Sequence, residues 1–169
     1  IIVDTEDHVK VMLQAFTELH SLSTSAEGNG DALALSVGID CEWRPTATRS
    51  DDDIDGHPVA LLQIGVPILN KVFLVDTHTL LRPGSCPTEA MVPTEALISK
   101  SVSTIFQSTR IVKTGFHVTN DFRRLAASFP HIPAFREIEA VINIETLAGK
   151  VHPTTSHHLL GSLQRLTKL

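Results

Sequence analysis

The stretch VGIDCEWRP, residues 37–45, combines the apolar pattern of a buried strand with two acidic side chains. Side chains alternate along a β-strand, so Asp40 and Glu42 are expected on one face and Ile39 and Cys41 on the other. Two carboxylates this close repel each other and resist burial unless a cation neutralises them. Oxygen ligands of this kind suit Mg²⁺ or Mn²⁺. The pattern therefore indicates either a cation site or a strand with a solvated polar face.

On both sides of this stretch, the chain contains further strand patterns, and helical patterns separate the later ones. Strands are expected at 1–3, 32–43, 59–67, 71–77, 110–115 and 139–145. Helices are expected at 4–22, 94–108 and 118–129, with a helical turn at 146–151 and a last helix from Ser156. Polar, Gly-containing or Pro-containing loops are expected at 23–31, 44–58 and 81–93. Hairpin-linked strands followed by strand–helix alternation predict an α/β domain over 1–169, with a mixed sheet flanked by helices.

The segment IVKTGFHVTNDFRRLA, residues 111–126, provides a third carboxylate. It reads as a buried strand, a tight turn at Gly115 and a helix in which Asp121 lies about one turn from the start. An apolar helix face at Val118, Phe122 and Leu125 is expected to pack on the sheet. Asp121 is either a partner of the acidic strand or an ordinary acid favoured near a helix N-terminus.

Together, VGIDCEWRP and KTGFHVTNDFRRLA resemble the first two motifs of the DEDD 3′–5′ exonucleases, in the branch of RNase D, the Werner exonuclease and Mut-7-like proteins. The segments ALLQIG, KVFLVDTHTL and VINIETLA fit as well, so the resemblance covers nearly the whole chain. It implies a ribonuclease H-like fold with a five-stranded mixed sheet. It also implies that Asp40, Glu42 and Asp121 are catalytic metal ligands for two Mg²⁺ or Mn²⁺ ions. Such enzymes remove nucleotides from the 3′ end of RNA or single-stranded DNA.

Four further residues are candidates for substrate contacts: Trp43, Phe116, His117 and Arg124. An aromatic side chain beside the cleft can stack on a terminal base, and cationic side chains can contact phosphates. Lys113 and Arg123 are weaker candidates for phosphate contacts. Without a substrate role, Trp43 would be a core or rim residue, and the arginines would lie on the solvated surface of their helix. Gln63 is expected to satisfy backbone groups or to help order the site.

The third motif of this branch, Tyr-x-x-x-Asp, is not found in the sequence. The chain contains no tyrosine and no aspartate after Asp121. The version of the motif that contains histidine is missing too, because no aspartate follows His157 and His158. The expectation is an exonuclease domain that is incomplete at its C-terminal end, so that the fragment itself is weakly active or inactive. The alternative is a natural protein that has lost this motif.

The overall composition leaves two other functions open. A net charge of −5 counts against a broad basic surface for nucleic acid. It favours a non-catalytic nucleic-acid-binding or protein-interaction module on the same fold, and an endonuclease of the wider ribonuclease H-like class is a third possibility. No signal peptide or membrane span is visible, and two cysteines form no disulfide framework. An intracellular protein is expected, either nuclear or cytoplasmic. The sequence does not distinguish RNA from DNA as the substrate.

Overall fold

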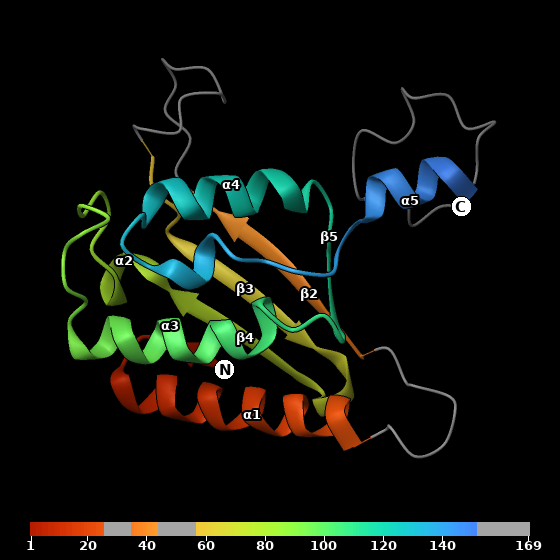
Figure 1. Cartoon of the computed structure of the whole chain (residues 1–169), viewed down its shortest axis with the longest axis horizontal. Helices are drawn as coiled ribbons and strands as arrows, with labels where there is room; N and C mark the ends of the chain where they lie inside the picture. The colour runs from red at the N-terminus through yellow and green to blue at the C-terminus, as the bar shows by residue number, and fades with distance from the viewer. Residues whose placement is uncertain (26–34, 44–56, 152–169) are drawn as a thin grey trace.

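A six-stranded mixed sheet lies at the centre of the fold (Figure 1). The computed structural model describes residues 1–25, 35–43 and 57–151. In spatial order the strands are β1 (Ile2–Val3), β4 (Lys71–Asp76), β3 (Leu61–Val66), β2 (Leu35–Glu42), β5 (Ile111–Gly115) and β6 (Val141–Asn143). Strand β3 is antiparallel to β2 and β4, whereas β2, β5 and β6 run parallel. The expected α/β fold is confirmed, with one strand more than the expected five.

The sixth strand of the sheet is β1, which has two residues and pairs in parallel with β4 at the edge. The sequence pattern predicts a strand at residues 1–3, but the five-stranded sheet implied by the family resemblance does not include it. The backbone of β1 extends the sheet by one row and leads directly into the first helix.

Three long helices pack against one face of the sheet: α1 (Glu6–Ser25), α3 (Pro93–Phe106) and α4 (Val118–Ser128). Figure 1 shows α1 and α3 lying side by side, with α4 near the end of β2. Aromatic pairs join these layers, because the ring centroids of Phe16 on α1 and Phe73 on β4 are 5.3 Å apart. Phe106 on α3 and Phe122 on α4 form a second pair at 5.5 Å. The expected apolar face of α4 is therefore buried.

Strand β2 separates buried from exposed side chains by strict alternation. Leu35, Val37, Ile39 and Cys41 are buried, whereas Ser36, Asp40 and Glu42 are exposed. The predicted faces are confirmed: the apolar side chains face the helices, and the two acids share the opposite face. The sheet thus presents both carboxylates without placing them in the core.

A close backbone contact at Gly115 fixes where α4 begins. A Cβ atom added at Gly115 would clash with the carbonyl oxygen of Ile39 and would lie 2.9 Å from Cβ of Val118. Only glycine allows the end of β5 to lie this close to β2 while the chain turns into α4. The tight turn predicted here is confirmed, and it sets α4 beside the acidic strand.

Several element boundaries differ from those expected. Helix α1 continues to Ser25, beyond the expected end at residue 22. Helix α5 (Ile144–Val151) begins two residues before the expected turn at 146–151. Helix α2 (Thr77–Leu80) was not expected, and the Asp76 carboxylate caps it by accepting hydrogen bonds from the Thr79 amide and hydroxyl. Short 3₁₀ turns lie at Pro67–Leu69 and Pro133–Phe135. The expected helix from Ser156 and most of the loops at 23–31 and 44–58 lie outside the described residues.

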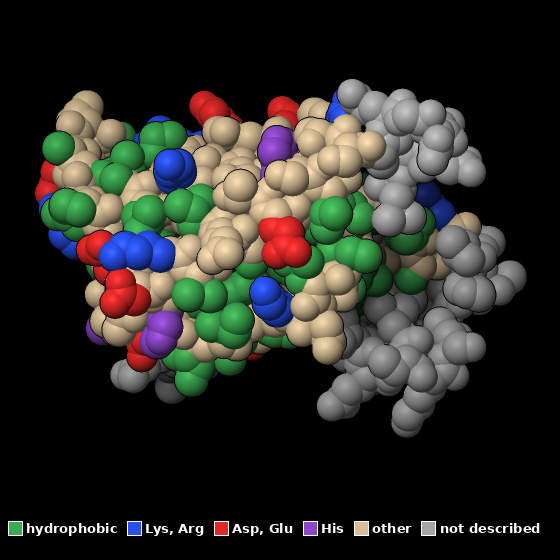
Figure 2. All heavy atoms as spheres, turned by 90° about the horizontal axis from the view of Figure 1, so that it is seen from below, with side chains coloured by type: hydrophobic (Ala, Val, Ile, Leu, Met, Phe, Trp, Pro, Cys, Tyr) green, Lys and Arg blue, Asp and Glu red, His purple; other side chains and the backbone are tan. Residues whose placement is uncertain are grey.

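The surface seen in Figure 2, from below, mixes acidic and basic side chains with hydrophobic and polar ones. On α1, Lys10 lies 3.1 Å from Glu6 and 2.9 Å from Asp7, so opposite charges are paired there. None of the described helices has both the length and the apolarity that a membrane span needs.

Candidate active site

Three carboxylates come from two elements in contact, strand β2 and helix α4. Asp40 and Glu42 are exposed on the open face of the sheet, and Asp121 lies in the first turn of α4 with 5% of its surface exposed. Burial, followed by the charges of Asp40 and Glu42, raises the pKa of Asp121 to about 7, and the charge of Arg124 opposes this rise. The charges of Asp40 and Glu42 therefore act on Asp121, so the fold places the predicted third acid near the acidic strand.

The chemistry of this carboxylate group fits a divalent cation, although the site is not assembled in advance. The Oδ2 atom of Asp121 is buried and has no hydrogen-bond partner. An unpartnered buried carboxylate oxygen is unfavourable, and a cation would satisfy it. Within the described residues, no three His, Cys, Asp or Glu side chains are already arranged to hold a metal ion. Carboxylates that repel one another are expected to stay apart until a cation draws them together.

Gln63 holds the carboxylate of Asp40 from the neighbouring strand. The two residues face each other across the antiparallel pair of β2 and β3, and Gln63 Nε2 donates a 3.2 Å hydrogen bond to Asp40 Oδ2. A cavity of about 460 Å³ opens beside this pair, and Gly115 and Phe116 also line it. The prediction that Gln63 helps to order the site is supported by this contact. Phe116 is the one predicted substrate contact that lines this cavity with Asp40.

Trp43 and Arg124 contact each other. The guanidinium carbon of Arg124 lies 4.0 Å from the centre of a Trp43 ring, which is a cation–π contact. Arg124 is only 3% exposed, and Trp43 packs partly buried against the core. As the side chains stand, they join α4 to the end of β2, and they do not extend into solvent as phosphate contacts commonly do.

His117 is paired with an acid that the sequence interpretation did not include in the site. His117 has a positive φ of 56° at the start of α4, and its Nδ1 lies 3.1 Å from Glu145 Oε2. The Phe116 and His117 rings meet edge to face at 4.4 Å. Glu145 follows β6, which is parallel to β5, so both residues lie beyond the carboxyl ends of neighbouring strands. That parallel order is the signal that could have revealed Glu145.

The suggestion that Lys113 contacts phosphate is wrong. Its side chain is fully buried on β5, and Nζ donates hydrogen bonds to the carbonyl oxygens of Ile105, Ser108 and Ile111. These bonds satisfy carbonyl groups around the end of α3. In the sequence, Lys113 occupies a strand position whose side chain faces the helices, which argues for a structural lysine.

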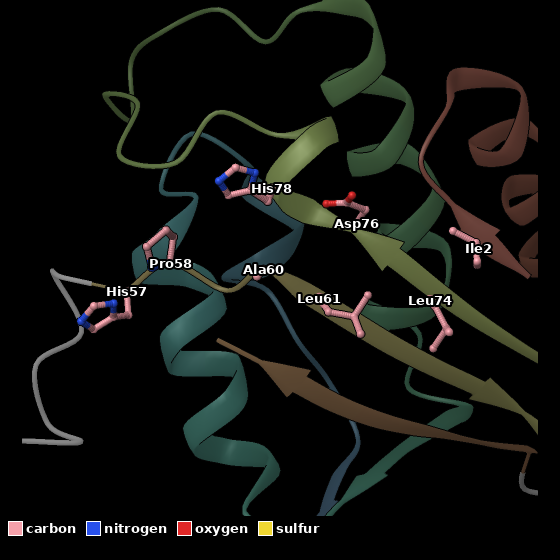
Figure 3. Close-up of a pocket in the computed structure, with 8 residues that line it drawn as sticks. All are labelled: Ile2, His57, Pro58, Ala60, Leu61, Leu74, Asp76 and His78. Atoms are coloured by element: carbon pink, nitrogen blue, oxygen red, sulfur yellow. The ribbon is translucent and has the colours of Figure 1, made fainter. Parts of the chain in front are cut away.

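A second cavity, of about 630 Å³, lies near the edge of the same open face (Figure 3). Ile2, Leu61 and Leu74 line it from three neighbouring strands, and His57 and His78 lie at its side. None of the three clustered carboxylates lines this cavity. Its walls are largely apolar, so it differs in chemistry from the acidic site next to it.

The described fold is similar to that of exonuclease domains among the solved structures. The EXO domain of Aedes aegypti Nibbler matches with a TM-score of 0.54 and 18% identity, over 92% of this chain and 57% of that one. RNase D of Trypanosoma brucei matches at 0.52 and 20%, over 86% and 37%. The EXD2 exonuclease domain matches at 0.55 and 18%, over 94% and 62%. The fold implied by the motifs is therefore confirmed.

At the level of sequence, no protein-family model matches the chain, and no curated protein matches it. The chain spans between 37% and 62% of the length of the three proteins named above. What they share with it is a fold. The function has to be argued from the residues of the site.

Proposed function

We propose that this chain is a 3′–5′ exonuclease domain that hydrolyses phosphodiester bonds of RNA or single-stranded DNA with divalent metal ions. One observation carries the proposal: Asp40 and Glu42 share the open face of β2, and α4, which contacts β2, carries the buried Asp121 with an unpartnered carboxylate oxygen. A fold has no structural need to bring three repelling acids together, since each adds an unfavourable electrostatic energy. Binding of Mg²⁺ or Mn²⁺ would offset this electrostatic energy and explain why the three acids are there.

In the proposed site, Asp40, Glu42 and Asp121 hold one or two Mg²⁺ or Mn²⁺ ions. When bound, such ions lower the pKa of water and neutralise charge at a scissile phosphate. Gln63 keeps the Asp40 carboxylate oriented through its hydrogen bond. Phe116 lines the cavity beside Asp40, which supports a contact with a sugar or base of the substrate. His117 is a second candidate contact at the start of α4.

The proteins with the same fold support a nucleic-acid substrate. The Trypanosoma brucei RNase D structure is a complex with RNA U12, and the EXD2 exonuclease domain was soaked in Mn and GMP. These ligands agree with the oxygen-rich donor set of this chain. We therefore propose a nucleic acid 3′ end as the substrate, with RNA and single-stranded DNA both open.

A non-catalytic binding module on the same fold is the second candidate. It is favoured by the lack of any tyrosine in the 169 residues, because the related motif uses tyrosine to orient the attacking water. The same fact leads us to expect low turnover from this chain even if the exonuclease proposal is correct.

Metal binding and strand shortening, measured together, test the proposal. Mn²⁺ is titrated by calorimetry into the wild-type chain, Asp40→Asn and Asp121→Asn, with Glu18→Gln on the surface of α1 as the control. We expect binding by the wild type and the control, and at least tenfold weaker binding by the two site variants. Equal binding by all four proteins, or none by the wild type, would overturn the metal site.

Single strands of RNA and DNA labelled at the 5′ end are then incubated with Mn²⁺. An exonuclease gives a ladder that shortens from the 3′ end and disappears in Asp40→Asn. Internal fragments would indicate an endonuclease. Metal binding with intact strands, even at high protein concentration, would favour the binding module.

A further inference from the structure

The contact between Arg124 and Trp43 joins the two elements that carry the three carboxylates. Trp43 directly follows Glu42 at the end of β2, and Arg124 follows Asp121 by three residues on α4. Residues three apart on a helix lie on the same side, so Arg124 and Asp121 both face the end of β2. The guanidinium lies 4.0 Å from the Trp43 ring centre and is almost wholly buried.

Besides its buried apolar face, α4 is held in place by close backbone, hydrogen-bond and cation–π contacts along its length. At the start of α4, Gly115 allows close approach to the carbonyl of Ile39. At its end, the Val59 amide donates a 3.0 Å hydrogen bond to the Ser128 hydroxyl. Between these two ends, the stack of Arg124 on Trp43 is the contact nearest in sequence to both Glu42 and Asp121.

From this geometry we propose that Arg124 and Trp43 are positioning residues, whose stacked pair sets the separation between Asp121 and the carboxylates of β2. The inference rests on the proposed function, because it concerns the same metal site. It replaces the phosphate and base contacts expected for these two residues. A planar guanidinium on an aromatic face holds both side chains in one orientation, which a flexible lysine does not do equally well.

A positioning role and a charge role predict opposite results when Arg124 is changed. If Arg124 acted only through its positive charge, its removal would strengthen cation binding nearby, because like charges repel. Replacing Trp43 would then have no effect, since the charge remains. If the stack positions the carboxylates, loss of either partner weakens cation binding.

The test measures Mn²⁺ affinity by calorimetry for the wild type, Arg124→Met, Trp43→Leu and the double variant. The control is Arg123→Met, which removes an equal charge from an exposed position on α4. We expect each stack variant to bind about tenfold more weakly than the wild type. The double variant should be no weaker than either single one, because the pair acts as a unit. The control should bind as the wild type does.

Intrinsic fluorescence reports separately on the contact itself. Trp43 is the only tryptophan and the chain has no tyrosine, so emission comes from this ring. Arg124→Met should shift that emission, and unchanged emission would mean that the stack does not exist in solution. Tighter Mn²⁺ binding by Arg124→Met, with Trp43→Leu unchanged, would overturn the positioning role and leave the metal site standing. Absence of Mn²⁺ binding by the wild type would overturn both.

Discussion

At the scale of single residues, Asp121 combines an unfavourable environment with a useful position. It is 5% exposed, one of its oxygens has no partner, and its pKa is raised to about 7 by burial and by its acidic neighbours. Residues that perform chemistry are often less stable in place than an alternative side chain would be. The apo protein is therefore expected to gain stability when this charge is removed.

Asp121→Asn should raise the free energy of unfolding of the metal-free chain by about 1–3 kcal/mol, because burial and the charges of Asp40 and Glu42 disfavour the carboxylate ion, which asparagine cannot form. The measurement is urea unfolding at pH 8 in the presence of a chelator. Glu137→Gln, at an exposed position, serves as the control and should change little. A less stable Asp121→Asn chain would mean that the carboxylate has favourable contacts in the absence of metal.

Gly115 at the end of β5 and Gly38 within β2 make a matched pair. Gly115→Ala should destabilise the fold by about 2 kcal/mol or more, because its Cβ would clash with the Ile39 carbonyl and press on Val118. Gly38→Ala should be tolerated, since a Cβ there meets nothing within 4 Å. Urea unfolding of both variants checks this. Similar losses at the two positions would contradict the close approach of β5 to β2.

At the scale of elements, two buried charged groups fix α3 at its ends. Lys113 satisfies carbonyl groups near its C-terminus, and Glu95 accepts hydrogen bonds at its N-terminus from Arg82 and the Val92 amide. Both side chains are fully buried. Because α3 packs on α1 and contacts α4, these ends help to keep the helical layer in place behind the site.

Lys113→Met should lower the free energy of unfolding by about 3 kcal/mol or more, because three carbonyl groups lose a charged donor. Lys100→Met, at an exposed position on α3, is the control. Binding of a single strand by the folded variant should stay unchanged when corrected for the unfolded fraction. Weaker strand binding by a fully folded Lys113→Met chain would restore the phosphate contact that the structure argues against.

The pH dependence of the free energy of unfolding should show how much the ionised Glu95 side chain stabilises the fold. Burial alone would raise its pKa, but hydrogen bonds from Arg82 and the Val92 amide outweigh burial and lower the pKa from 4.5 to about 2. A carboxylate with a depressed pKa stabilises the fold above its unfolded value, and this contribution is lost as the pH falls from 4.5 to 2. It amounts to about 3 kcal/mol. Urea unfolding of the wild type and Glu95→Gln at pH 7 and pH 2.5 measures it. A difference between the two proteins that stays constant with pH would contradict the lowered pKa.

The sequence predicted elements with a regular apolar pattern better than it predicted contacts between residues far apart in the chain. The faces of β2 follow from local alternation, and the order strand, glycine, helix predicts the turn at Gly115, although its close contact is with Ile39 on another strand. Helix α2 was missed because it depends on the capping carboxylate of Asp76. The burial of Lys113 agrees with its alternation with Ile111 on β5, whereas the burial of Arg124 involves Trp43, which is far away in the sequence.

At the scale of the whole molecule, the parallel order of β2, β5 and β6 assembles the candidate site. Residues that follow these strands meet at one edge of the sheet, which is where ligands bind in α/β folds. Asp40 and Asp121 are joined by this topology although 81 positions separate them. The resemblance of two short motifs was enough to predict that pairing. The link between His117 and Glu145 was not predicted, because it depends on β6 lying next to β5.

A cation should stabilise the whole molecule, because this chain of net charge −5 gathers three acids at one point. At a Mn²⁺ concentration of about 100 times the dissociation constant, binding to the folded state alone adds about 2.7 kcal/mol to the free energy of unfolding. For a chain of this size that raises the melting temperature by about 5–10 °C. Calorimetric melting with and without Mn²⁺ measures the shift, and a chelator should reverse it. Asp40→Asn should lose most of the shift, whereas Asp7→Ala, an exposed acid on α1, should keep it. An equal shift in all three proteins would place the cation at a general acidic surface and would remove the physical basis of the proposed site.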